Sequence, residues 1–174
     1  MITEEHITVA TAHKLVLLGW EIIAVHAPDG QGPFTIPRAP KMRKIERSSY
    51  HPDIVAIKKD KDKKIKILIV ECKVNQNDVN SDIEKIQNLT NSPDALYFIC
   101  FRCHSFQGGP EIGVDFSKIS ESALNELPIE IGFAYLKSGA GLSLPYEING
   151  FRVHNFSFSK SELLCMLNEL KIKL

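Results

Sequence analysis

The sequence predicts an α/β fold in which a mixed central sheet carries helices on both faces. Two neighbouring runs, residues 53–58 (DIVAIK) and 64–73 (KIKILIVECK), are apolar at both odd and even positions. This pattern is typical of internal strands that are covered on both sides. Amphipathic helical patterns begin and end the chain and separate strand-like runs. At 174 residues the chain is most simply one domain, residues 1–174.

The first part of the chain predicts a helix, a strand and a long loop. Thr3 is the expected N-cap, with Ile2 and Ile7 placed as a hydrophobic staple, and the helix should end before Gly19. Residues 20–26 (WEIIAVH) follow as a strand. Residues 27–50 hold four prolines and two glycines, which predicts a loop longer than a compact domain normally needs. Such loops are usually functional or mobile.

The two apolar runs come next, joined by a charged turn, and further elements follow them. The patterns predict a helix over 81–89, a strand over 95–103, a helix within 113–127, strands over 129–137 and 150–158, and a closing helix over 160–170 capped by Ser159 or Ser161. On this interpretation residues 3–103 form the core of the fold in the order helix, strand, strand, strand, helix, strand. Residues 104–174 are a C-terminal extension.

The composition and the N-terminus exclude the obvious membrane classes. No apolar stretch approaches the ~18–20 residues needed to span a bilayer. The first twenty residues lack a basic region and carry two glutamates before their apolar part, so they predict a helix and not a signal peptide. We therefore expect a cytoplasmic protein with no membrane partner.

The charge is zero overall but unevenly distributed. Between Arg38 and Lys66 there are 11 lysines and arginines against 4 acidic residues, a local excess of seven positive charges. A neutral protein with one basic segment can still engage a polyanion, because affinity depends on the local charge presented. A solvated hairpin and loop is the alternative interpretation.

The cysteines predict reduced thiols. Cys72, Cys100, Cys103 and Cys165 are expected to be mostly buried. Residues 100–104 (CFRCH) match the pattern of c-type haem attachment, but alternation along a strand would send the two cysteines to opposite faces. We therefore expect a chance match and no haem. No second Cys/His pair has the spacing of a zinc site.

Acidic residues at the ends of the two apolar runs are predicted to meet. In an antiparallel hairpin whose turn is centred on Asp62, residue 53 lies opposite residue 71, which places the β-carbons of Asp53 and Glu71 roughly 4.5–5.5 Å apart. Lys73 then shares the face of Glu71, and Cys72 points the other way.

Two carboxylates side by side among apolar neighbours repel each other unless a divalent cation lies between them. Hard oxygen ligands at that separation suit Mg²⁺, which typically shares its shell with waters and a phosphate. An ammonium two residues further on could contact that water or the phosphate. An ordinary surface cluster of Asp, Lys and Glu at the strand ends is the alternative.

These residues resemble the signature of the PD-(D/E)XK nuclease superfamily: Pro52-Asp53, then seventeen residues, then Glu71-Cys72-Lys73. That superfamily includes many type II restriction endonucleases and archaeal Holliday-junction resolvases. The resemblance extends over the predicted order of elements in residues 3–103, and it implies a restriction-endonuclease-like core with a C-terminal appendix.

The resemblance also implies roles for these residues. Asp53 and Glu71 would ligate Mg²⁺, the backbone carbonyl of Cys72 would complete the inner shell, and Mn²⁺ would be able to substitute. Lys73 would orient or help activate the attacking water. The reaction would be phosphodiester hydrolysis that leaves 5′-phosphate and 3′-hydroxyl ends.

The resemblance leaves other roles open. Many members use a glutamate on the first helix, for which Glu4 and Glu5 are the candidates, although a solvated first-turn acid favoured by the helix dipole explains them equally well. Members also often turn polar residues of the helix after the lysine toward the site or the DNA. Lys85 and Gln87 are in that position here, and solvent-facing side chains on an amphipathic helix are the alternative.

Basic residues precede the predicted metal-site strand. Residues 38–47 form a proline-stiffened basic loop in which Arg38, Lys41, Arg43 and Lys44 are expected to contact DNA phosphates. The lysines near the hairpin turn lie about six to ten residues from the site at ~3.3 Å each, so they are expected to be solvated and to guard the strand ends.

The sequence therefore predicts a Mg²⁺-dependent DNA endonuclease that acts as a homodimer. Restriction-type cleavage is favoured over junction resolution, because the long loop and residues 104–174 provide material for base readout and dimer contacts. The alternative is a nuclease-like DNA-binding or structural subunit without catalysis of its own. The uncertain helix acid, the neutral charge and the small size motivate that alternative.

Overall fold

The computed structural model describes residues 1–26, 51–59, 61, 65–105 and 128–174. Its elements in chain order are α1 (Glu4–Leu17), β1 (Glu21–Val25), β2 (Ile54–Lys59), β3 (Ile65–Asn75), the 3-10 turn η2 (Gln76–Asp78), α2 (Val79–Thr90), α3 (Pro93–Ser105), β4 (Ile129–Leu136), β5 (Glu147–Ile148), β6 (Phe151–Phe158) and α4 (Lys160–Glu169). The strands form one six-stranded sheet in the order β1-β2-β3-β4-β6-β5. The basic loop and the helix predicted within 113–127 lie outside the described residues.

The sheet is mixed, as predicted. Strand β2 runs antiparallel to both β1 and β3, whereas β3, β4 and β6 run parallel to one another, and the short β5 pairs antiparallel with β6. The hairpin of β2 and β3 has the expected register, with Ile54 opposite Val70 and Lys59 opposite Ile65. Strand β3 is central, and six consecutive residues of it are buried.

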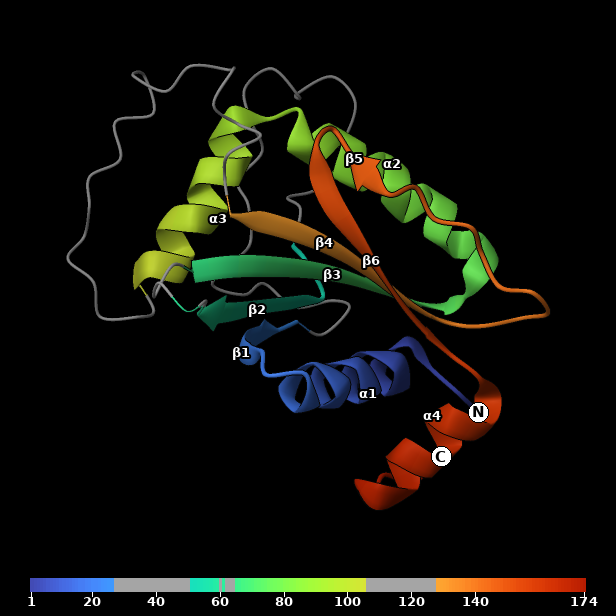
Figure 1. Cartoon of the computed structure of the whole chain (residues 1–174). Coiled ribbons are helices and arrows are strands. Elements are labelled where there is room, and N and C mark those ends of the chain that lie inside the picture. The colour runs from blue at the N-terminus through green and yellow to red at the C-terminus, as the bar shows by residue number, and fades with distance from the viewer. Residues whose placement is uncertain (27–50, 60, 62–64, 106–127) are drawn as a thin grey trace.

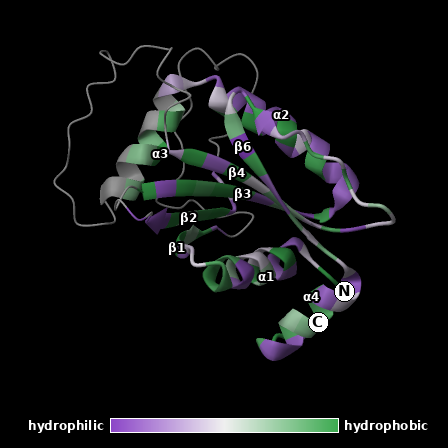
Figure 2. Cartoon of the chain, viewed as in Figure 1, coloured by the Kyte–Doolittle hydropathy of each residue, from purple (hydrophilic) through white to green (hydrophobic). Residues whose placement is uncertain are grey.

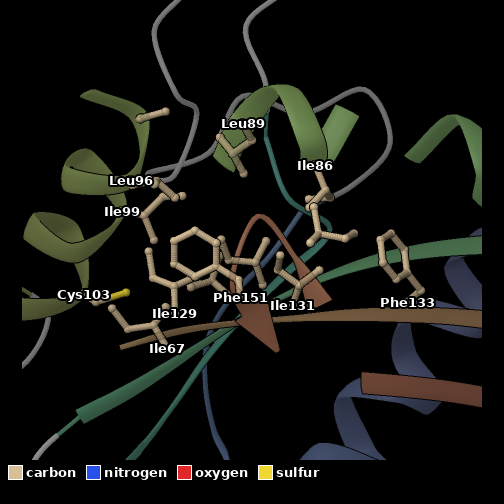
Figure 3. Packing of buried hydrophobic residues seen from close by; sticks show 14 of the residues in the cluster. Ile67, Ile86, Leu89, Leu96, Ile99, Cys103, Ile129, Ile131, Phe133 and Phe151 are labelled. Carbon is tan, nitrogen blue, oxygen red and sulfur yellow. The ribbon is translucent and has the colours of Figure 1, made fainter. Parts of the chain in front are cut away.

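Two apolar layers cover the two faces of the sheet, with α2 and α3 on one side and α1 and α4 on the other (Figure 1). On the α2/α3 face, side chains such as Ile86 and Ile99 pack against Ile67, Ile131 and Phe133 (Figure 3). On the α1/α4 face, the even-numbered residues of β3 contact α1 and α4. Figure 2 shows β2 and β3 largely hydrophobic along their length, as strands covered on both faces must be.

Local signals in the sequence fix both ends of α1. Thr3 caps the helix, with the side chain of His6 closing a capping box, and Gly19 adopts φ +87° just past its end. Ile2 and Ile7 lie in the same apolar cluster, which agrees with the predicted staple. Ser159 is the cap of α4, where Glu162 completes a second capping box.

One predicted element is wrong. Residues 95–103 were expected to form a strand, but they lie within the helix α3. The run is apolar at nearly every position, and a short apolar run cannot be assigned to strand or buried helix by periodicity alone. On a helix Cys100 and Cys103 occupy neighbouring positions, so the argument that alternation separates them also fails. Burial raises the pKa of both thiols to about 12, which keeps them protonated.

Because residues 95–103 are helical, the fourth strand of the sheet comes from a later part of the chain. On the side away from β2, the neighbour of β3 is β4, followed by β6 and β5, so three strands of the sheet come from residues assigned to the C-terminal extension. Residue 103 is therefore not a boundary of the sheet. In the described part of the chain, no helix has both the length and the apolar character needed to cross a membrane.

Candidate functional site: an acidic cluster around Lys73

Asp53 is fixed in place at the end of the hairpin. It lies directly before β2 and is 8% exposed. Its backbone carbonyl accepts a hydrogen bond from the N–H of His26 at 2.9 Å. Its side-chain Oδ2 accepts one from the backbone N–H of Cys72 at 2.7 Å. The backbone of Asp53 is therefore held by the residue that follows β1, and its carboxylate is held by β3.

Glu71 lies on β3 beside Asp53. The last residue pair of the hairpin is Ile54 with Val70, and the same register, continued by one residue, places Asp53 opposite Glu71. The Glu71 side chain is 5% exposed. Cys72 points to the opposite face of the sheet, where it joins the cluster under α1 and α4. The predicted separation of Cys72 from the two carboxylates is thus confirmed.

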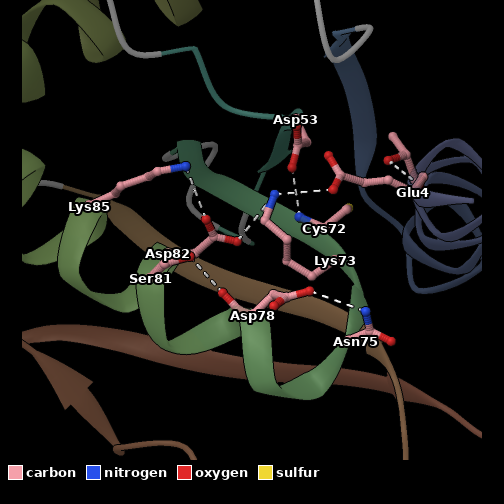
Figure 4. Close-up of polar contacts among 10 residues, drawn as sticks. Glu4, Asp53, Cys72, Lys73, Asn75, Asp78, Ser81, Asp82 and Lys85 are labelled. Atoms are coloured by element: carbon pink, nitrogen blue, oxygen red, sulfur yellow. Dashed lines mark hydrogen bonds and ion pairs between the residues drawn. The ribbon is translucent and has the colours of Figure 1, made fainter. Parts of the chain in front are cut away.

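Lys73 is enclosed by acidic side chains from two helices (Figure 4). Its Nζ donates a hydrogen bond to Oε2 of Glu4 at 3.2 Å and lies 3.7 Å from Oδ2 of Asp82. Lys85 contacts the other oxygen of Asp82, Oδ1, at 3.3 Å. Residues from α1, the start of β2, β3 and α2 therefore meet at one end of the sheet. We call Glu4, Asp53, Glu71, Lys73 and Asp82 the Lys73 cluster.

Two opposing effects set the pKa values in the cluster: burial favours the neutral form of each group, and contacts with opposite charges favour the charged form. Burial raises the pKa of Asp53, and the N–H of Cys72 and the ammonium of Lys73 lower it by less. Burial also raises the pKa of Asp82 against the lowering effect of Lys73 and Lys85. For Lys73, burial favours a lower pKa, but the carboxylates of Asp82 and Glu4 outweigh it and the pKa is raised. The lysine therefore stays protonated at neutral pH.

Asp82 is the member of the cluster that the sequence interpretation missed. It is completely buried, and its Oδ2 has no hydrogen-bond partner, since Lys73 is beyond hydrogen-bond length. The helix starts at Val79, two residues earlier than predicted, and Asp82 shares its apolar stripe with Val79, Ile86 and Leu89. A carboxylate at that spacing on the buried face of a helix was the available signal.

The structure also places the residues whose roles were open. Glu4, and not the exposed Glu5, contacts Lys73. Lys85 turns toward the cluster through Asp82 but is 46% exposed, whereas Gln87 is exposed. Arg38, Lys41, Arg43 and Lys44 lie outside the described residues.

The residues of the cluster fit a hard divalent cation. Asp53 and Glu71 supply carboxylate oxygens, and Mg²⁺ is commonly held by one or two carboxylates with waters and substrate phosphates. With Lys85 included, four acidic groups face two ammonium groups, an excess of two negative charges if all are ionised. Within the described ranges, no group of three or more His, Cys, Asp or Glu side chains could hold a metal ion. A Mg²⁺ ion here would therefore depend on water and substrate for the rest of its shell.

Comparison of the chain with protein-family models, with curated protein sequences and with solved structures finds no match.

Proposed function

We propose that the protein is a Mg²⁺-dependent endonuclease that hydrolyses phosphodiester bonds of DNA. One observation carries the proposal: two buried carboxylates, Asp53 and Glu71, stand at the end of a hairpin beside a protonated lysine, Lys73. Burying two acids at one strand end is unfavourable for folding, which argues for a role that needs them there. The resemblance of these residues to the PD-(D/E)XK signature supports the same reaction.

The roles follow from the charges of the side chains. Asp53 and Glu71 would hold Mg²⁺, with the backbone carbonyl of Cys72 as a third oxygen, and the ion would supply Lewis-acid activation of water and stabilisation of the phosphate charge. Lys73 is a poor proton acceptor, since its pKa is raised. Its ammonium instead orients the water and stabilises negative charge on the phosphate. Glu4 and Asp82 hold that ammonium in position.

Restriction-type cleavage of a short DNA site by a homodimer remains our preferred form of this activity. The basic segment 38–47 directly precedes the metal-site strand in sequence and supports contacts to phosphates there. Cleavage of four-way junctions is the variant of the same chemistry that the resemblance also allows. Activity on junctions irrespective of sequence would rule out the restriction-type form.

A nuclease-like DNA-binding subunit without catalysis is the second candidate. Two observations favour it. The ammonium of Lys73 is already paired with Glu4 and Asp82, and the described residues contain no group of three or more side chains that could ligate a metal. Under this alternative the protein binds DNA in a salt-sensitive way and gains no affinity from Mg²⁺.

The test is cleavage of supercoiled plasmid, linear phage DNA and a four-way junction in Mg²⁺ and in EDTA. Wild type is compared with Asp53→Asn and Lys73→Met, and Lys85→Met is the matched control because it removes a more exposed ammonium that contacts the cluster through Asp82. We expect Mg²⁺-dependent cleavage that is lost in the first two variants and kept in the control. Discrete fragments indicate site-specific cleavage, and smearing indicates a nuclease without such specificity.

Two results would contradict the proposal. If the folded wild type binds DNA but cleaves none of the three substrates in Mg²⁺, the non-catalytic subunit is the better description. If Asp53→Asn and Lys73→Met both cleave like wild type, the active site lies elsewhere in the chain.

A further inference from the structure

A second polar site lies on the other face of the sheet, at the end of α1. There a cavity of about 300 Å³ is lined by the segment after α1 and by β2, β3, β4 and β6. Its lining residues are Leu18, Trp20, Lys58, Lys59, Lys66, Glu130, Arg152, His154 and Phe156. Cavities that bind small ligands begin at about this volume. Arg152 and His154 come from β6, far along the chain from the lysines.

The cavity is strongly cationic. It is lined by four basic side chains, those of Lys58, Lys59, Lys66 and Arg152, and by a single carboxylate, that of Glu130. Lys58 is already engaged, since its Nζ donates to the carbonyl of Leu18 at 2.9 Å. Among the described residues, the side chains of Lys59, Lys66 and Arg152 form no hydrogen bond or ion pair, and Lys66 and Arg152 act on Glu130 only at longer range.

The carboxylate in the cavity is already paired. Oε1 of Glu130 lies 2.7 Å from Nε2 of His154, and Lys66 and Arg152 are close enough to lower the pKa of Glu130 in addition to this contact. The His154 ring in turn stacks on Phe156, with centroids 5.8 Å apart and 11° between the ring planes. The His154 ring is therefore held by both Glu130 and Phe156, and the single carboxylate does not cancel the excess of positive charge.

The cavity is separate from the Lys73 cluster. Lys66 and Lys73 are seven residues apart on β3, which corresponds to ~23 Å along a strand. The odd and even positions of β3 also face opposite sides of the sheet, since Ile69 packs under α2 and α3 and Leu68 under α1 and α4. A phosphate bound in the cavity is thus not the phosphate that is cleaved.

We infer that this cavity binds a phosphate-type oxyanion, carried either by a free nucleotide or by the backbone of a nucleic acid. Arg152 presents a guanidinium fork suited to two phosphate oxygens, and Lys59 and Lys66 add point charges. From the sequence, the lysines of the hairpin are expected to be exposed to solvent and to protect the strand ends from pairing with other chains. The structure brings three of them, Lys58, Lys59 and Lys66, into one cavity with the distant Arg152.

The test uses the only tryptophan of the chain as its reporter, because Trp20 lines the cavity. Inorganic pyrophosphate, ATP and a short single-stranded oligonucleotide are titrated in EDTA at low salt, and calorimetry gives a second readout that does not depend on Trp20. We expect saturable binding that weakens about tenfold in Arg152→Gln and in Lys66→Gln, because each removes one charge-assisted contact.

Two further variants sharpen the test. Glu130→Gln should tighten binding several-fold, since it removes the one negative charge from the cavity while its amide oxygen can still contact His154. Lys160→Gln removes an exposed ammonium at the start of α4, outside the cavity, and should leave affinity unchanged. Asp53→Asn should also bind like wild type, so this inference stands independently of the proposed nuclease activity.

The outcomes separate the two sources of phosphate. Binding of pyrophosphate and ATP that the oligonucleotide cannot displace identifies a free nucleotide, and displacement by the oligonucleotide identifies a nucleic-acid backbone. The inference is overturned if none of the three ligands binds saturably. It is equally overturned if Lys160→Gln weakens binding as much as Arg152→Gln, because the attraction would then be non-specific.

Discussion

Replacing Lys73 by methionine tests the electrostatic account of the cluster without reference to catalysis. Methionine keeps much of the length of the lysine side chain but removes the ammonium that partners Glu4 and Asp82. Asp82, which is completely buried, then keeps only the half-exposed Lys85. We expect the variant to fold, but with a lower free energy of unfolding.

The magnitude follows from the contacts. Breaking a buried ion pair by removing one partner destabilises a protein by about 3–5 kcal/mol. Here the lysine side chain is 20% exposed and Lys85 still contacts Asp82, so the loss should be smaller, about 2–3 kcal/mol at neutral pH. A typical domain has about 5–15 kcal/mol of stability, so the variant should remain folded.

The loss should depend on pH in a defined direction. Folding already raises the pKa of Asp53 and Asp82, and removing the nearby ammonium raises both further. The folded state therefore holds protons that the unfolded state has released, and stability falls as pH rises through the folded pKa values. The gap between the variant and wild type should thus be smallest just above the ordinary carboxyl pKa of 3.8 and should widen toward neutral pH.

Urea unfolding in EDTA at a series of pH values from mildly acidic to mildly basic measures this gap. Lys85→Met is the control, since it removes the more exposed partner of Asp82 and should lower stability by less than about 1 kcal/mol. The reasoning is refuted if Lys73→Met is as stable as wild type at pH 8. It is also refuted if the gap does not grow with pH.

Three further predictions follow from individual contacts. Asp53→Asn should raise the melting temperature in EDTA by a few degrees, because the amide can still accept from Cys72 while the unfavourable buried charge is gone, and it should abolish stabilisation by Mg²⁺. Gly132→Ala should lower the free energy of unfolding by about 1–3 kcal/mol in urea titrations, since its Cβ would lie 2.6 Å from Cε2 of Phe156. Ser159→Ala should lower it by about 1 kcal/mol through loss of the cap of α4.

Each of these predictions has a result that would count against it. A lower melting temperature for Asp53→Asn in EDTA would mean that its carboxylate is favourably paired when metal-free. For Gly132→Ala, adding Phe156→Leu should recover part of the lost stability, and strict additivity of the two substitutions would disprove the clash. An unchanged unfolding free energy in Ser159→Ala would show that water replaces the cap.

The sequence by itself determined the central hairpin and its polar end. Runs that are apolar on both faces, an acidic residue before one strand and Glu71-Cys72-Lys73 at the end of the next were enough to predict the register and the neighbouring positions of Asp53 and Glu71. This worked because strand alternation and hairpin pairing are local rules with a fixed period. The caps of α1 and α4 were readable for the same reason, since a capping box spans only four residues.

Tertiary structure alone decided which distant residues join these elements. Residues 95–103 form a helix whose buried apolar side chains pack against one face of the sheet. The fourth strand of that sheet comes from residues 129–136, and no local sequence pattern indicates this. Asp82 and Glu4 meet at Lys73 only because α2 and α1 lie on opposite faces and begin near the same strand terminus. Likewise, Arg152 reaches the hairpin lysines only through the order of strands in the sheet. Such long-range pairings depend on the packing of whole layers, which a single sequence does not display.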